Sequence, residues 1–207
     1  MAEWRKVNGL EEAMSKKKAA LKHVHYKLLR PVGIIGNPGT GKSTIGDALA
    51  KAAGLERTDI DPCIEAVYGG RKLQDIYDEL GYGKFIRAEG FIARWVFDSH
   101  SEPRIYMPGG SFDKWGETVQ HYKDGGTFFA YVQDDFDRIM KSIGRRPLRG
   151  IAVEPGKTLE QELRDRIPLF EHDKDITIHV GGDRHHAAKE LFEVLLGEGI
   201  IVRIEAE

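Results

Sequence analysis

Short apolar runs alternate with segments of helical periodicity along most of this 207-residue chain. The runs predict buried strands, and apolar positions that recur every three or four residues predict amphipathic helices. The predicted strands are 31–35, 57–60, 104–107, 127–132 and 176–180. The predicted helices are 44–53, 72–80, 84–98, 113–123, 135–142, 159–170 and 185–196. This alternation predicts an α/β fold in which a five-stranded parallel sheet is flanked by helices and binds ligands at the carboxyl ends of its strands.

The two ends of the chain differ from this pattern. Residues 9–28 have helical spacing, and residues 1–30 hold eight Lys and Arg against three Glu, so we expect a basic amphipathic extension. It could bind an acidic partner or a membrane surface, but its apolar face lacks Trp and Phe, which favours packing on the core or on a neighbouring subunit. We expect the main domain to cover residues 31–197. Residues 198–207 form a tail in which 200–204 could add an edge strand.

Composition narrows the class of protein. The net charge of −2 gives no overall basic surface for nucleic acid, and no apolar run has the length of a membrane span. A secretory signal is not recognisable, and one cysteine excludes an intrachain disulfide. We therefore expect a cytoplasmic protein without nucleic-acid or membrane partners. Its oligomeric state, monomer or homodimer, stays open.

Residues 36–44 read GNPGTGKST and match the phosphate-binding loop G-x-x-x-x-G-K-[ST]. The loop follows a predicted strand and opens a predicted helix, whose N-terminus favours bound phosphate. Glycines let successive N–H groups point at an anion, the lysine adds a positive charge, and the serine hydroxyl is a ligand for Mg²⁺. The predicted nucleotide-binding residues are Gly36, Gly39, Thr40, Gly41, Lys42, Ser43 and Thr44.

Two carboxylates, Asp59 and Asp61, end the second predicted strand. Strand alternation turns both toward the phosphate-binding loop. One can help to hold Mg²⁺ and the other can orient a proton of an attacking hydroxyl, as phosphoryl transfer requires. Asp61 is also expected to cap a helix that begins at Pro62.

Two glycine-containing loops complete the candidate site. In Pro108-Gly109-Gly110 the glycines either let the backbone approach a ligand or form a plain tight turn. Residues 144–157 are rich in arginine and flanked by glycines, which fits either a solvated basic loop or a mobile lid whose arginine reaches the transferred phosphate.

These motifs together resemble shikimate kinases over about residues 31–197. The resemblance rests on the phosphate-binding loop, residues 59–61, 85–89, 109–110, 146–148 and 166–171, which occur in the order and rough spacing of that family. It implies a P-loop fold of the nucleoside-monophosphate-kinase type with a mobile lid. It also implies ATP and Mg²⁺ as cofactors, and a hydroxyl of a small carboxylated ring as the phosphate acceptor.

The resemblance also implies a role for each matching residue. Lys42 and Ser43 would bind the nucleotide and Mg²⁺, and Asp59 would belong to the metal shell. Catalysis would use Lys42, Asp61 as the residue that activates the hydroxyl, and Arg146 as the lid arginine. The adenine would lie near Lys141 and Arg184. The acceptor would be bound by Asp61, Arg87, Glu89, Gly109, Gly110 and Arg166, the last of which would bind its carboxylate.

The chain departs from the family pattern on the acceptor side. Ile86 occupies the position of a carboxylate-binding arginine, Arg87 follows one residue later, and Pro108 replaces the first of three glycines. One residue turns a helical side chain by about 100°, so Arg87 should point away from the acceptor unless the helix shifts its register. Shikimate is the first expected acceptor, with another small hydroxy acid or polyol as the alternative. A nucleotide-binding regulatory module that has lost its acceptor is a further alternative.

Overall fold

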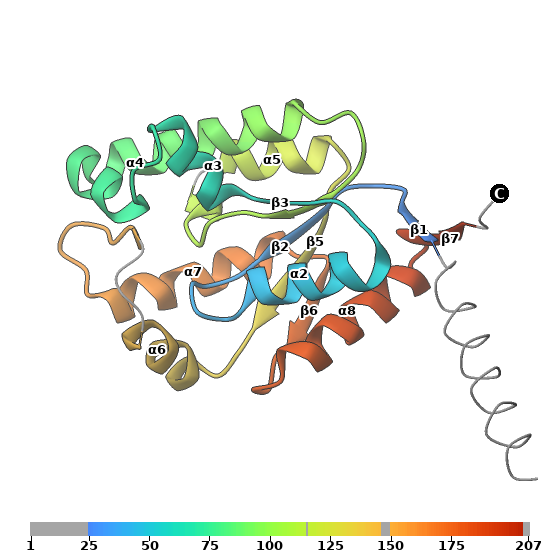
Figure 1. Ribbon diagram of the computed structural model, residues 1–207. Helices are drawn as coiled ribbons and strands as arrows, with labels where there is room; N and C mark the ends of the chain where they lie inside the picture. The colour runs from blue at the N-terminus through green and yellow to red at the C-terminus, as the bar shows by residue number, and fades with distance from the viewer. Residues whose placement is uncertain (1–24, 115, 146–149, 205–207) are drawn as a thin grey trace, which may run out of the picture.

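A computed structural model describes residues 25–114, 116–145 and 150–204 and places a parallel sheet between two layers of helices (Figure 1). The fold class predicted from the sequence is thereby confirmed. All neighbouring strands of this sheet are parallel, and β2 lies at its centre. In spatial order the strands are β3 (Arg57–Asp59), β4 (Ile105–Met107), β2 (Val32–Ile35), β5 (Phe128–Gln133) and β6 (Ile176–His179).

The helices cover the sheet because each face carries its own apolar cluster. One cluster joins the sheet to α2 (Lys42–Ala53) and α8 (Arg184–Gly197). The cluster on the other face joins the sheet to α3 (Ile60–Val67), α4 (Leu73–Asp98), α5 (Gly116–Asp124) and α7 (Leu159–Asp173). The short η2 (Phe112–Lys114) follows β4, and α6 (Phe136–Gly144) follows β5. β2 is buried along its whole length, as the central strand of such a sheet must be.

Helix α4 combines two predicted helices. The sequence separates 72–80 from 84–98, and the structure joins them across a kink at Gly81, whose φ of 69° and ψ of 170° are not helical. Glycine adopts such a positive φ without steric cost. The second half of α4 carries Phe85 and Glu89, which line one cavity together with residues of the phosphate-binding loop.

The N-terminal helix prediction is wrong at its end. Residues 25–28 form a strand, β1 (His25–Leu28), rather than the last turn of a helix. It pairs antiparallel with β7 (Ile201–Ile204), so β7 belongs to a separate two-stranded sheet and does not extend the edge of the main one. Tyr26 and Leu28 both pack on the core. They are two residues apart, which is the spacing at which side chains of a strand face the same side. Residues 1–24 and 205–207 lie outside the described residues.

The start of α3 also differs from the prediction. The helix begins at Ile60, and its N-cap is Asp59, whose side chain accepts a hydrogen bond from the Asp61 backbone N–H at 3.3 Å. Asp61 is therefore within the first turn and does not cap the helix, which leaves its carboxylate available for other contacts.

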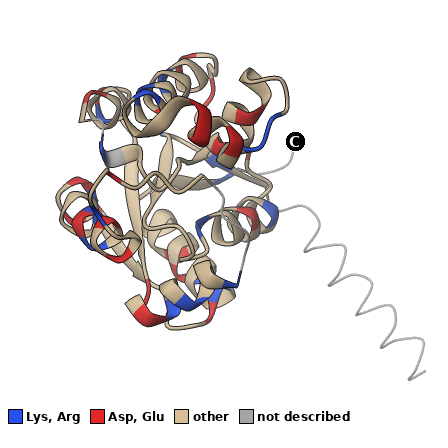
Figure 2. Cartoon of the chain, turned by 90° about the vertical axis from the view of Figure 1, so that its left-hand side faces the viewer, with Lys and Arg blue, Asp and Glu red and all other residues tan. Residues whose placement is uncertain are grey.

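Charges of both signs are distributed over the elements seen in Figure 2. None of the helices in the described ranges is long and apolar enough to cross a membrane.

Candidate active site

The loop between β2 and α2 curves around a space that is lined by backbone. Gly36, Gly39 and Gly41 have φ values of 142°, 90° and 99°, a region that side chains disfavour. Gly41 immediately precedes α2, so the free N–H groups of the first helical turn face the loop's interior. This geometry is that of an anion-binding loop at a helix N-terminus.

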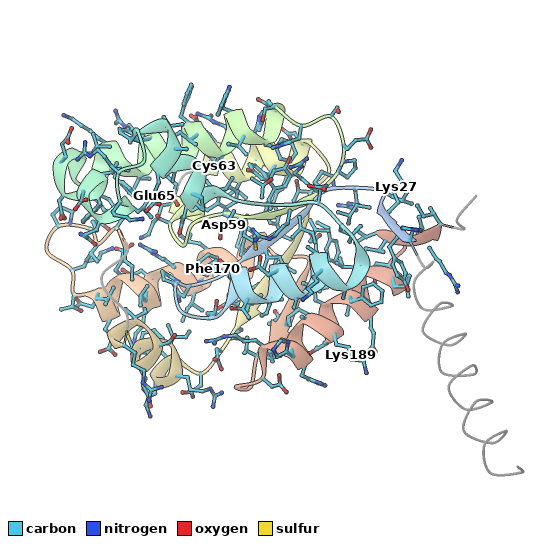
Figure 3. The ribbon with its side chains drawn as sticks, viewed as in Figure 1. Lys27, Asp59, Cys63, Glu65, Phe170 and Lys189 are labelled. Atoms are coloured by element: carbon cyan, nitrogen blue, oxygen red, sulfur yellow. The ribbon has the colours of Figure 1, made fainter. Side chains whose placement is uncertain are left out.

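Lys42 and Ser43 extend from the first turn of α2. The Lys42 Nζ donates hydrogen bonds to the carbonyl oxygens of Gly36 at 2.7 Å and Asn37 at 3.2 Å, which hold the ammonium across the loop. The Ser43 hydroxyl donates to Asp59 Oδ2 at 2.9 Å. Figure 3 shows Asp59 at the end of β3, close to the start of α2. The structure thus brings together the lysine, the serine and the first carboxylate predicted from the sequence.

Asp61 lies in a concentration of negative charge. Burial, together with the charges of Asp59 and Glu89, raises its pKa from the ordinary value of 3.8 to about 7, and the charge of Lys42 opposes this rise. Glu89 is buried, which raises its pKa, and it accepts a hydrogen bond from the Ser111 hydroxyl. A group with a pKa near neutrality is suited to accept and return a proton.

Gly109 and Gly110 let these groups approach one another. A Cβ at Gly109 would clash with Glu89 Oε1 and lie 3.0 Å from Asp61 Oδ1. A Cβ at Gly110 would lie 2.6 Å from Cδ of Pro38 in the phosphate-binding loop. The β4–η2 loop therefore fits between the nucleotide side and the carboxylates because it lacks side chains there.

Arg166 is fully buried in α7, but it is already paired. Its Nε donates to Glu162 Oε1 at 3.1 Å, and its Nη2 donates to the Ala152 carbonyl. Glu162 also receives Lys114 Nζ at 3.2 Å and the Glu154 N–H at 3.2 Å. Burial opposes ionisation of Glu162, yet Arg166 and these hydrogen bonds hold its pKa below the usual value.

A cavity of about 310 Å³ joins these groups into one site. Its wall includes the phosphate-binding loop, the carboxylates at the end of β3 and the loop after β4. The predicted site residues that line it are Gly39, Gly41, Lys42, Ser43, Thr44, Asp59, Asp61, Glu89, Gly109, Gly110 and Arg166.

Other predicted residues lie elsewhere. Arg87 is exposed and lines a separate surface hollow with Tyr82 and Lys114, because it lies one position beyond the buried Ile86 on α4. Lys141 is exposed on α6 and does not line the cavity, although Ser142 and Ile143 do. The structure thus does not bring Arg87 or Lys141 to this cavity.

The remaining nucleotide residues lie on or near the loop. Arg184 packs against it, and its Nη2 is 3.5 Å from the Gly39 carbonyl. Thr40 is buried and donates its hydroxyl to Asn37 O at 3.0 Å, so it shapes the loop. Arg146 lies outside the described residues.

The sequence did not identify Glu162, Ser111 or Lys114. Glu162 and Arg166 are four residues apart on a helix, which is the spacing of an ion pair. That signal was present in the sequence, but many surface pairs share it. Only the burial of both side chains makes this pair part of the site.

The residues beside the loop fit a magnesium ion. In the described ranges no group of three or more His, Cys, Asp and Glu side chains is placed to form an all-protein metal site. Mg²⁺ in phosphoryl-transfer sites needs few protein ligands, because phosphate oxygens and waters complete its shell. Ser43 and Asp59, which already share a hydrogen bond, supply the hydroxyl and carboxylate oxygens that this arrangement requires.

Comparison with known proteins gives one consistent family. A family model described as shikimate kinase matches residues 38–196. A shikimate kinase from Thermobifida fusca is 28% identical over 82% of this chain and 95% of the relative. One from Rhodococcus jostii is 30% identical over 72% of this chain and 87% of the relative. The fold resembles that of a shikimate kinase from Acinetobacter baumannii solved in complex with shikimate, with a TM-score of 0.69, 23% identity, and coverage of 82% of this chain and 95% of that one.

The match with the family model spans most of the chain and includes residues 38–44 of the phosphate-binding loop, both aspartates and Arg166. These findings favour a phosphotransferase that acts on a hydroxyl group over a nucleotide-binding regulatory module. This chain belongs to the shikimate kinase family.

Proposed function

We propose that this protein transfers the γ-phosphate of ATP to a hydroxyl group of shikimate. The observation that carries the proposal is a single cavity that joins a phosphate-binding loop to Asp61 and Arg166. Membership of the shikimate kinase family and the shikimate bound to the Acinetobacter baumannii enzyme support this acceptor.

On the phosphate side, the site consists of the phosphate-binding loop and the start of α2. The glycines of the loop and the N-terminus of α2 bind the phosphate oxygens through backbone N–H groups. Lys42 neutralises charge that develops on the transferred phosphoryl group. Ser43 and Asp59 would hold Mg²⁺, which would supply neutralisation of phosphate charge and alignment of the phosphate chain.

On the acceptor side, Asp61 orients the attacking hydroxyl and takes its proton as the oxygen bonds to phosphorus. Gly109 and Gly110 line the cavity beside Asp61, where the ring of the acceptor would bind. Arg166 contributes the positive charge on the acceptor side of the cavity. Arg146, on the segment between α6 and Gly150, would stabilise charge on the transferred group, and this segment would act as a lid that excludes water.

The proposal is tested by measuring ADP release and the phosphorylated product with purified protein, Mg-ATP and shikimate. Wild-type protein should form one shikimate phosphate per ADP. Lys42→Met should lower kcat/KM at least a hundredfold, because the variant loses the charge at the transferred phosphate. The matched control is Lys51→Met at the exposed end of the same helix, which should retain activity. The proposal is rejected if wild-type protein forms no product from shikimate.

A further inference from the structure

Glu162 binds the edge of the Arg166 guanidinium that would otherwise be available to the carboxylate of a ligand. Its Oε1 lies 3.1 Å from Arg166 Nε and 3.0 Å from Nη2, and Nη2 also donates to the Ala152 carbonyl. A guanidinium binds a carboxylate most strongly with two parallel hydrogen bonds from one edge. In this structure the Nε–Nη2 edge is already satisfied by the protein itself.

Glu162 is held firmly in that position. Both side chains of the pair are buried, and Glu162 also receives hydrogen bonds from Lys114 and from the Glu154 backbone. Displacing Glu162 from Arg166 would leave a buried carboxylate with fewer partners, which is costly. Lys114 pairs with the same Glu162 oxygen but lines the separate surface hollow with Ile86 and Arg87 and not this cavity.

The rest of the cavity wall is unfavourable to an acceptor that carries a negative charge. Among the described residues, four carboxylates and two cations line it: Asp47, Asp59, Asp61, Glu89, Lys42 and Arg166. Lys42 is directed to the phosphate-binding loop, and the Nε–Nη2 edge of Arg166 is occupied by Glu162, a carboxylate that also pairs with Lys114. Hydroxyl groups of a ligand, in contrast, can donate hydrogen bonds to these carboxylates whether or not the ligand carries a charge.

We propose that Glu162 sets the acceptor preference of this kinase by holding Arg166, so that the site phosphorylates uncharged cyclic polyols as well as shikimate. This inference rests on the proposed function. The reaction is the same for both acceptors: a hydroxyl oxygen bonds to the γ-phosphorus, the bond to the β–γ bridging oxygen breaks, the hydroxyl proton passes to Asp61, and ADP leaves. Glu162 is a positioning residue, since it acts through Arg166.

The test compares two acceptors that differ in one group. One is shikimate, and the other is its reduced analogue, in which a hydroxymethyl group replaces the carboxylate. We expect the wild-type kcat/KM values for the two to lie within about tenfold. Glu162→Gln keeps the shape of the side chain but removes its charge, and should raise the preference for shikimate at least tenfold, mainly through a lower KM for shikimate.

The matched control is Glu160→Gln. Glu160 forms an exposed pair with Arg164 on the same helix and at the same spacing, at 2.8 Å, so this control should leave the ratio unchanged. A general loss of structure would lower both kcat/KM values together and would not change their ratio. The wild-type ratio supplies a test that does not depend on folding of the variant.

The inference is overturned if wild-type protein prefers shikimate by more than tenfold. It is also overturned if folded Glu162→Gln fails to shift the ratio at least tenfold relative to Glu160→Gln. Both results leave the proposed kinase function intact. If the wild-type protein phosphorylates neither acceptor, the proposed function is rejected, and this inference with it.

Discussion

Asp61 shows how burial and two neighbouring carboxylates can prepare one side chain for proton transfer. Burial and the carboxylates of Asp59 and Glu89 bring its pKa to about 7. Because the ionised form accepts the hydroxyl proton, kcat/KM should rise with pH through about 7 and then level off. Asp61→Asn should lower kcat/KM by about 10²- to 10⁴-fold and abolish this rise. A pH–rate profile of both proteins checks this, and an unchanged rise in the variant would contradict it.

The same residue should reduce stability at neutral pH. The folded state binds the Asp61 proton more tightly than the unfolded chain does, so stability is lost as pH rises from about 4 to about 7. Asp61→Asn should therefore unfold like wild type at pH 4 but be more stable at pH 8, by a few kcal/mol at ~1.4 kcal/mol per pKa unit. Urea denaturation at the two pH values measures this difference, and equal stability at pH 8 would refute it.

Gly109 is a second residue whose role depends on close approach. Gly109→Ala would direct a methyl group at Glu89 Oε1 and crowd Asp61. We expect kcat/KM to fall at least tenfold and stability to fall by ~1–3 kcal/mol. The control is Gly83→Ala in α4, where a Cβ meets nothing within 4 Å. This substitution should raise the free energy of unfolding by ~0.5–1 kcal/mol, because alanine loses less conformational freedom than glycine in a helix. Equal behaviour of the two variants would show that the close approach at Gly109 does not matter.

At this scale the sequence identified residues better than their contacts. The phosphate-binding loop, Asp59 and Asp61 follow from local spacing, and the structure places them together. Glu162 was not predicted, because an acidic residue four positions before an arginine is ordinary on any helix surface. Arg87 was expected to bind the acceptor only if the helix shifted its register by one residue relative to the family pattern, and its position on α4 turns it to solvent.

At the scale of elements, the segment 150–154 is fixed by α4 and α7. The Gly150 N–H donates to Gln74 Oε1 at 2.9 Å, and the Tyr77 hydroxyl bonds both the N–H and the carbonyl of Val153, at 3.2 and 3.1 Å. This segment carries the Ala152 carbonyl that receives Arg166. Helix α4 therefore positions one wall of the acceptor site.

Tyr77→Phe should release that segment. The variant leaves two backbone groups of Val153 without their partner, which should cost ~1–3 kcal/mol of stability and raise the KM for the acceptor severalfold more than the KM for ATP. Steady-state kinetics and limited proteolysis near residue 150 measure these effects. Tyr26→Phe is the control, because Tyr26 packs edge-on against Phe192 and its hydroxyl has no hydrogen bond within the described part of the chain. A Tyr77→Phe variant with unchanged kinetics would contradict this role.

Element types were predicted well because their signals are local, whereas pairing partners were not. The period of apolar positions gave all five strands of the main sheet and the helices around it. The pattern of 25–28 also fits a helix, and only its distant partner, 201–204, makes it a strand. Contacts between residues so far apart along the chain leave no mark on local periodicity.

At the scale of the whole molecule, β1 and β7 join the two ends of the described chain (Figure 1). They lie beyond the amino-terminal ends of the parallel strands, opposite the phosphate-binding loop. Leu28 of β1 and Ile201 of β7 are buried in the cluster that α2 and α8 share with the sheet. This small sheet therefore closes the core on the side away from the active site.

Two truncated proteins separate this structural role from catalysis. A chain that starts at His25 keeps β1, whereas one that starts at Leu29 loses four strand pairs and uncovers Ile201. The shorter protein should be less stable by ~2–5 kcal/mol, comparable to removing a large buried side chain. At a temperature where both are folded, their kcat/KM values should agree within about threefold, because the site lies at the opposite ends of the strands. Thermal unfolding and kinase assays on the pair measure both quantities. Equal stability would show that β1 does not close the core, and a selective loss of activity in the shorter protein would place part of the active site's support in β1.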